Sequence, residues 1–197
     1  MIIEAMLYLD DIIENWSNSE IERHLRDVSA ERQEKIRSYA RPLDRELSLK
    51  SYQLLQKGLK CQYGISEPPI FKYNQYKKPS LAQYPNIHFN LSHCEHAAAC
   101  YIAEHPVGID VEKIDSFDSD FAQYVLNPKE YEQVKMSENP AVEFTLLWTM
   151  KESLIKLIGE GIDNQSLPNI LHNRSLYHFE STINKEKGYV VTSCIVK

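Results

Sequence analysis

The chain has 197 residues, of which 43% are hydrophobic and 25% charged, an ordinary composition for a globular protein of one large or two small domains. Its formal net charge of −6 argues against general nucleic-acid binding, and no apolar run reaches the roughly 20 residues of a membrane span. The N-terminus carries no basic region before an apolar run, so we expect no signal peptide and a cytoplasmic protein. Cys61, Cys94, Cys100 and Cys194 lack a CxxC spacing, which favours idle thiols over a zinc site or disulfides.

The N-terminal half is expected to be mainly helical. Residues 2–9 are typical of a short strand, and Ser19 with Glu22 has the spacing of a capping box at the start of a helix. A second helix is expected over about 30–39, and a longer one from Pro42 through about residue 60. Residues 66–69 are typical of a loop, and residues 73–79 of a turn or sheet edge.

The charge of this half is opposite to that of the whole chain. Residues 21–60 contain ten Lys and Arg against six Asp and Glu, which leaves +4 in an acidic protein. Such a region could hold an anionic ligand or partner. It could equally be a solvated helical surface.

The centre of the chain is expected to be rich in strands, and the C-terminal half to mix helices with strands. Residues 87–92 alternate apolar and polar side chains, residues 97–103 suit a more buried strand, and residues 107–112 form a third strand. Helices are expected over about 118–136, restarting at Pro128, and over about 140–158, where Gly159 is a C-terminal stop. Residues 174–196 are expected to form the strands that close the fold. A boundary near residue 105 divides the chain into subdomains 1–104 and 105–197.

The strand at 107–112 carries two acids on one face. Its apolar residues Val107, Ile109 and Val111 alternate with Gly108, Asp110 and Glu112. Because a strand has a period of two, Asp110 and Glu112 point the same way. Two carboxylates on a half-buried face repel each other unless a positive charge lies between them. A hard cation such as Mg²⁺ would meet this need, with substrate phosphates completing its coordination.

The helix at 140–158 carries a polar face beside its apolar stripe. Thr145, Thr149, Glu152 and Lys156 recur at steps of four, three and four, so they share one side of the helix. Lys151 lies within the apolar stripe, where it either extends its amine to the surface or meets an anion in a cleft. A surface ion pair between Glu152 and Lys156 is the plainer interpretation.

Ser92 and His93 end an expected strand, where small polar groups often meet ligands. Both could donate hydrogen bonds to a phosphate. Adjacent residues of an extended segment point to opposite sides, so His93 is badly placed to deprotonate Ser92. Spacing alone assigns no role to Glu130.

Together, and in this order, these segments resemble the 4′-phosphopantetheinyl transferase superfamily, in its monomeric surfactin-synthetase-activating type. The resemblance rests on four segments, which are Lys78-Pro79, residues 89–93 (FNLSH), residues 107–113 (VGIDVEK) and residues 148–156 (WTMKESLIK). It covers about residues 29–160. It implies an α/β fold (α+β) of two similar α/β subdomains related by a pseudo-twofold, with the ligand cleft between them.

The resemblance also implies an activity and its partners. Members transfer the 4′-phosphopantetheine moiety of coenzyme A to a serine of an apo acyl or peptidyl carrier protein and release adenosine 3′,5′-bisphosphate, with Mg²⁺ or Mn²⁺ as the metal. We therefore expect a monomer that binds coenzyme A and a carrier protein and neither nucleic acid nor a membrane. The carrier could belong to fatty acid, polyketide or nonribosomal peptide biosynthesis.

Each site residue is carried over by position. Asp110, Glu112 and Glu152 match the metal ligands, and Glu130 matches a proposed general base toward the acceptor serine. Lys156 matches a lysine on the pyrophosphate, and Lys151 belongs to the same motif, so Glu130, Lys156 and Lys151 form the expected catalytic set. Lys78, Ser92 and His93 match coenzyme A phosphate contacts, while Arg32 and Lys35 match residues that hold the 3′-phosphate.

One departure and two alternatives remain. The family often has an arginine where this chain has Leu47, so either Arg45 or Lys50 substitutes or the contact is missing. The chain could instead be a metal-dependent hydrolase of a phosphoanhydride or phosphodiester. It could also be a non-catalytic coenzyme A-binding or carrier-binding protein of the same fold.

Overall fold

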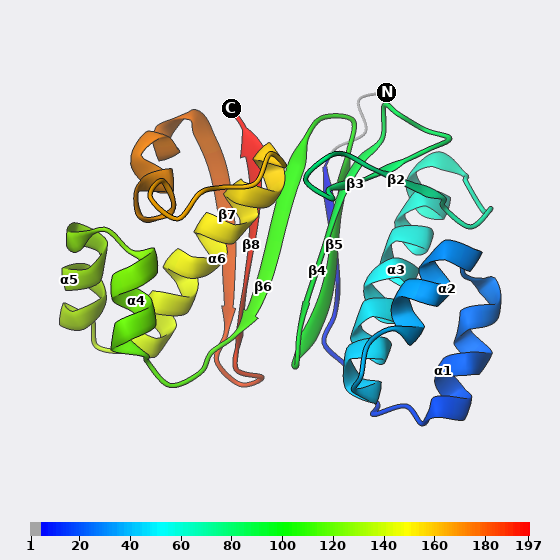
Figure 1. The fold of residues 1–197 in the computed structure, drawn as a ribbon, viewed down its shortest axis with the longest axis horizontal. Coiled ribbons are helices and arrows are strands. Elements are labelled where there is room, and N and C mark those ends of the chain that lie inside the picture. Colours follow the sequence, from blue (N-terminus) through cyan, green and yellow to red (C-terminus); the bar gives the residue numbers. More distant parts are fainter. Residues whose placement is uncertain (1–4) are drawn as a thin grey trace.

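The structure, a computed structural model, describes residues 5–197 of the chain. The first half contributes strands β1 (Met6–Asp10), β4 (His88–Cys94) and β5 (Ala97–Ala103), paired antiparallel in the order β1-β5-β4. Helices α1 (Asn18–His24), α2 (Ala30–Arg37) and α3 (Pro42–Tyr63), with the 3₁₀ turn η1 (Leu25–Asp27), lie on one side of this sheet (Figure 1). The part of the predicted 2–9 strand before residue 5 lies outside the described residues.

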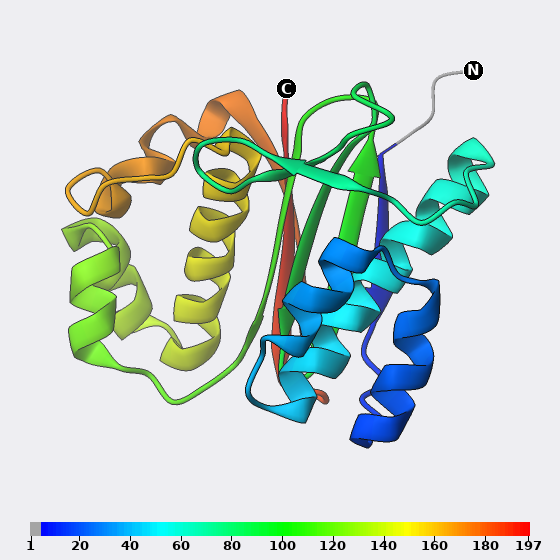
Figure 2. The same cartoon turned by 45° about the vertical axis from the view of Figure 1, so that its right-hand side comes forward.

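The second half contributes strands β6 (Val107–Lys113), β7 (Tyr177–Asn184) and β8 (Tyr189–Val196), antiparallel in the order β6-β8-β7. Helices α4 (Ser119–Val125), α5 (Pro128–Met136) and α6 (Pro140–Ile158) and the 3₁₀ segment η2 (Leu167–Leu176) cover its outer side (Figure 1). A small hairpin, β2 (Phe71–Tyr73) with β3 (Pro79–Leu81), runs from the α3 side toward the end of α6 (Figure 2).

The two halves repeat one topology. Each begins with a strand, continues through helices that end in a long one, and closes with two strands, the last of which takes the centre of its sheet. The α/β class is confirmed, and the two halves share this order of elements. The pseudo-twofold and a domain boundary at residue 104/105 stay predictions, although the β5–β6 connection does pass through residues 104–106.

The core explains why β6 presents its acids toward α6. Val107, Ile109 and Val111 pack between the two sheets with residues of β5 and β8, so the alternate residues face the opposite way, as predicted. On that opposite face, a Cβ at Gly108 would collide with the Ser153 carbonyl oxygen of α6. Glycine therefore allows the close approach of α6 to the strand that carries Asp110 and Glu112.

Most predicted helix boundaries are confirmed, and one is wrong. The restart at Pro128, the span of α6 and the left-handed cap at Gly159 (φ 70°) agree with the expectation. The capping box of α1 is formed by Ser17 and Glu20 instead of Ser19 and Glu22. The sequence offers a Ser-x-x-Glu spacing at both positions, and the helix begins at Asn18, so only the earlier serine lies ahead of its first turn. No helix within residues 5–197 is long and apolar enough to cross a membrane.

Candidate functional site

A hydrogen-bonded cluster joins the two halves of the molecule where the edge strands β4 and β6 meet. Asp110 of β6 is buried, and its Oδ1 accepts hydrogen bonds from Ser92 Oγ of β4 at 2.9 Å and from Lys156 Nζ of α6 at 2.6 Å. Lys156 Nζ also lies 3.0 Å from Ser92 Oγ, which in turn accepts from the Val111 N–H at 3.3 Å. Ser92 therefore links the two strands and donates to Asp110 in this structure.

Glu112 and Glu152 complete a group of carboxylates with a surplus of negative charge. Burial, and then the neighbouring Asp110, raise the pKa of Glu112 to about 7. The same two causes raise the pKa of Glu152. Lys156 opposes both shifts without cancelling them. The three acids thus lie close enough to repel one another, as the pattern of the sequence predicts.

The same acids fit a hard cation. Asp110 Oδ2 is buried without a hydrogen-bond partner among the described residues, and carboxylate oxygens are the ligands that Mg²⁺ prefers. Within residues 5–197, however, no three His, Cys, Asp or Glu side chains are already arranged around a metal position. Lys156 supplies the positive charge beside Asp110 in this structure. The assignment of Asp110, Glu112 and Glu152 as ligands stays a prediction.

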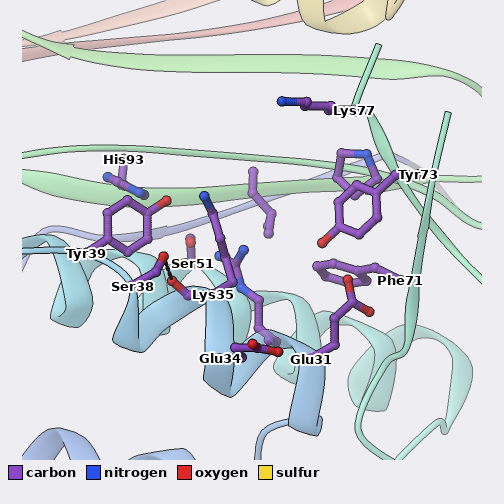
Figure 3. Close-up of a pocket in the computed structure, with 13 residues that line it drawn as sticks. Glu31, Glu34, Lys35, Ser38, Tyr39, Ser51, Phe71, Tyr73, Lys77 and His93 are labelled. Carbon is purple, nitrogen blue, oxygen red and sulfur yellow. Dashed lines mark hydrogen bonds between the residues drawn. The ribbon is translucent and has the colours of Figure 1, made fainter. Parts of the chain in front are cut away.

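A cavity of about 720 Å³ lies between α2 and the β2–β3 hairpin, and His93, the residue after Ser92, forms part of its wall (Figure 3). Arg32, Lys35 and His93 line it together with aromatic side chains. The Arg32 guanidinium lies 6.0 Å from the centre of the Phe71 ring and donates through Nη2 to Ser48 Oγ at 2.8 Å. Its Nε is buried without a partner in the described chain. The site thus presents cationic donors and flat apolar surfaces together.

His93 enters this cavity as a neutral side chain. Burial, and then the charges of Arg32 and Lys156, lower the pKa of His93 to about 4. The imidazole therefore carries one N–H donor near neutral pH. Ser92 and His93 point to different sides of β4, as predicted, and they do not form a nucleophile–base pair.

Lys78 lies at the C-terminal end of α6, away from Arg32. Its Nζ donates to the Leu157 carbonyl oxygen at 2.8 Å, and burial lowers the pKa of this amine. It lines an adjoining cavity of about 270 Å³ together with Lys156. One of the donors that the sequence assigns to a ligand therefore stabilises the end of a helix.

Lys151 and Glu130 form a second ion pair, separate from the carboxylate cluster. Lys151 Nζ lies 2.9 Å from Glu130 Oε2 and donates to the Pro168 carbonyl oxygen at 2.7 Å. Glu130 Oε2 also accepts from the Asn127 N–H at 3.1 Å, which completes a capping box at the start of α5. Within residues 5–197 no hydrogen bond or ion pair joins this pair to Asp110, Glu112, Glu152 or Lys156. Lys151 therefore neither reaches the surface nor faces a cleft.

Neither Arg45 nor Lys50, the two candidates to replace the arginine that the family often has at position 47, lines the large cavity. Lys50 is buried in ion pairs with Asp10 and Glu14 at 3.1 and 3.0 Å, and Arg45 donates to the Tyr39 carbonyl oxygen at 2.8 Å.

Sequence reasoning missed four residues that line the large cavity, the aromatic Tyr39, Phe71 and Tyr73 and the lysine Lys77. No spacing in the sequence marks these residues, because they come from three separate elements.

Comparison with known proteins gives the family. A family model described as the 4′-phosphopantetheinyl transferase superfamily matches residues 106–192. A 4′-phosphopantetheinyl transferase of Bacillus subtilis is 35% identical over 155 residues, covering 77% of this chain and 68% of the relative. The chain belongs to the 4′-phosphopantetheinyl transferase superfamily.

Two further relatives extend the comparison. The B. subtilis 4′-phosphopantetheinyl transferase ffp is 31% identical over 185 residues, 92% of this chain and 80% of the relative. The transferase gsp of Aneurinibacillus migulanus is 37% identical over 152 residues, 73% of this chain and 63% of the relative. The protein is accordingly an enzyme of the phosphopantetheinyl transferase class.

Proposed function

We propose that this enzyme transfers the 4′-phosphopantetheine moiety of coenzyme A to a serine hydroxyl of an apo acyl or peptidyl carrier protein and releases adenosine 3′,5′-bisphosphate. The observation that carries the proposal is the position of the cluster of Asp110, Glu112, Glu152 and Lys156 beside a cavity lined by Arg32, Lys35 and His93. A cation-binding group next to a basic, aromatic cavity suits a nucleotide that carries a pyrophosphate.

The nucleotide half of coenzyme A would occupy the large cavity. Arg32 and Lys35 would hold the 3′-phosphate from α2, and the neutral His93 would donate one hydrogen bond to a phosphate oxygen. Ser92 and Lys78 would donate further hydrogen bonds to phosphate oxygens, Ser92 from the contact between β4 and β6 and Lys78 from the adjoining cavity. The aromatic lining would cover the flat faces of the adenine.

Asp110, Glu112 and Glu152 would hold Mg²⁺, which, when bound, would neutralise charge on the pyrophosphate. The partnerless Asp110 Oδ2 and the raised pKa values of Glu112 and Glu152 support this assignment. A divalent cation would give the buried oxygen a partner and would favour the ionised form of both glutamates. Lys156 would then be free to leave Asp110 and donate to a phosphate oxygen.

The proposed reaction needs one proton acceptor and one stabilised leaving group. The serine oxygen would form a bond to the phosphorus on the pantetheine side of the pyrophosphate while the bond to the bisphosphate oxygen breaks. Lys156 would stabilise the negative charge that collects on this leaving oxygen. Glu130 would take the serine proton, directly or through one water, using Oε1, which has no hydrogen-bond partner among the described residues. Lys151 would position Glu130.

The direct test incubates the protein with coenzyme A, Mg²⁺ and a panel of apo carrier proteins and follows carrier mass by mass spectrometry. Addition of one phosphopantetheine per carrier supports the proposal, and chelation of the metal should stop it. A panel that never gains this mass would refute it. Release of free phosphopantetheine without any carrier would instead indicate a hydrolase, and tight coenzyme A binding without turnover a binding protein.

We further propose that the enzyme acts as a monomer, because two similar halves of one chain already contribute Ser92, Asp110 and Lys156 to a single cluster. Light scattering coupled to gel filtration should give the single-chain mass of 22.9 kDa. A stable dimer at micromolar concentration would overturn this part of the proposal.

A further inference from the structure

A short turn at residues 74–78, between β2 and β3, is tied to the C-terminal end of α6. Asn74 Nδ2 donates to the Gly159 carbonyl oxygen at 2.8 Å, and Lys78 Nζ donates to the Leu157 carbonyl oxygen, also at 2.8 Å. The other end of the Asn74 amide, Oδ1, accepts from the N–H groups of Tyr76 and Lys78 at 3.0 and 2.9 Å. The position of the turn is thus determined by the second half of the molecule.

Lys77 in this turn has a left-handed backbone. Its φ is +64°, a conformation that disfavours a side chain bearing a Cβ and that glycine adopts readily. The Lys77 N–H donates to the Asn74 carbonyl oxygen at 3.0 Å, which closes the turn. A lysine held in such a conformation points to a role for its side chain, since nothing in the turn geometry favours it over glycine.

The Lys77 side chain lies where two cavities meet. It lines both the cavity of about 720 Å³ and the adjoining cavity of about 270 Å³ that contains Lys156. Figure 3 shows Lys77 across the large cavity from Lys35, with Glu31 and Glu34 on the helix side, away from Lys77. Within residues 5–197, no carboxylate pairs with the Lys77 amine. The side chain is therefore a cation without an ion-pair partner in the described chain, and it faces a cavity whose far wall carries Arg32 and Lys35.

We propose that Lys77 is a third cation for the 3′-phosphate of the nucleotide, acting from the hairpin opposite Arg32 and Lys35. This inference rests on the proposed use of coenzyme A and adds a specificity-determining residue to it. Like charges that converge on one cavity repel each other, and a terminal phosphate with two negative charges removes that repulsion. The left-handed turn is then the structural requirement for directing this amine across the cavity.

Binding of coenzyme A and of 3′-dephospho-coenzyme A, each measured by isothermal titration calorimetry, tests the inference. Lys77→Gln keeps a polar side chain that is only one atom shorter and removes its charge, so it should weaken coenzyme A binding by about tenfold, as expected for loss of a charge-assisted hydrogen bond. Binding of 3′-dephospho-coenzyme A should stay within about twofold. The matched control is Lys72→Gln, because Lys72 is an exposed lysine of the same hairpin that lines neither cavity; this variant should bind both ligands as the wild type does.

A second variant separates the side chain from the turn. Lys77→Gly relieves the left-handed strain, so its melting temperature should equal or exceed that of the wild type while its affinity for coenzyme A falls as in Lys77→Gln. An unchanged affinity in both variants would overturn the inference. An equal loss for both ligands would also overturn it, because it would place Lys77 on a phosphate other than the 3′-phosphate.

Failure of this inference and failure of the proposed function give different results. If the wild type modifies a carrier but Lys77→Gln binds coenzyme A normally, only the role of Lys77 is wrong. If no carrier is modified while Lys77→Gln still loses its preference for the 3′-phosphate, the transfer reaction is wrong and the nucleotide site stands.

Discussion

Two lysine–carboxylate pairs on α6 differ in ways that separate a site from a structural contact. Lys156 and Asp110 lie 2.6 Å apart in a group with three carboxylates for one lysine, and 29% of the Lys156 side chain is exposed. Lys151 and Glu130 lie 2.9 Å apart as a matched pair, the Lys151 side chain is fully buried, and two backbone carbonyl oxygens accept further hydrogen bonds from its amine. Surplus charge beside a cavity is the pattern expected of a reaction site, whereas the Lys151–Glu130 contact is balanced and satisfied, so the proposed role of Glu130 as general base needs its own test.

The largest effect should come from the surplus-charge group. Asp110→Asn keeps the shape of the side chain but removes the charge that Lys156 and a metal would share, so carrier modification should fall by at least about 100-fold. The rate of carrier mass gain under saturating coenzyme A measures this. Asp120→Asn, at an exposed acid of α4, is the control and should retain full activity. Full activity in Asp110→Asn would contradict the metal assignment.

Glu130→Gln tests whether the matched pair also takes part in the reaction. Glutamine can still accept from Asn127 and Lys151 but cannot take a proton, so a general base at this position predicts a fall in kcat of about 100-fold or more with little change in KM. A folded variant with normal kcat would show that Glu130 only caps α5. This variant tests most directly whether the two pairs differ in function.

The sequence predicted the faces of Asp110 and Lys156, but not their contact, because its plainer interpretation paired Lys156 with Glu152 and the structure pairs it with Asp110. The period-two pattern of β6 and the 3.6-residue period of α6 determine which faces carry Asp110 and Lys156, so local rules suffice once the elements pack. Lys151 meets Glu130 because α5 packs beside α6, and Lys78 reaches a carbonyl 79 residues away. No local rule supplies such contacts. The family resemblance added the roles of these residues, and those roles are still predictions.

A smaller difference between the two pairs should appear as stability. Removing the Lys151 amine leaves Glu130 and two buried carbonyl oxygens without their partner, so Lys151→Met should lower the free energy of unfolding by about 3 kcal/mol. Lys156→Met removes a partly exposed amine from the buried Asp110, but Ser92 Oγ still donates to this carboxylate, so the loss should be smaller, about 1 to 2 kcal/mol. Urea unfolding of both variants at one pH measures the contrast. Equal losses would mean that the fully buried Lys151 contributes no more to stability than the partly exposed Lys156.

The smallest expected effect is a pH dependence of the melting temperature, which arises from the cluster of Asp110, Glu112 and Glu152. The pKa of Glu112 is about 7 in the folded protein against an ordinary value of 4.5, so between these values the folded state binds more protons than the unfolded state. Without metal, stability from this group is therefore present below pH 4.5 and is lost as the pH rises toward 7. The melting temperature should fall from pH 5.5 to pH 7.5 by more in the wild type than in Glu112→Gln.

Mg²⁺ should reverse this trend, because a cation favours the ionised carboxylates. Its addition should raise the wild-type melting temperature more at pH 7.5 than at pH 5.5, and this difference should shrink in Glu112→Gln. Glu160→Gln, at an exposed acid past the end of α6, should behave as the wild type. Parallel pH profiles for wild type and Glu112→Gln would show that the carboxylate surplus does not centre on β6, and the distinction between the two lysine pairs would then rest on exposure alone.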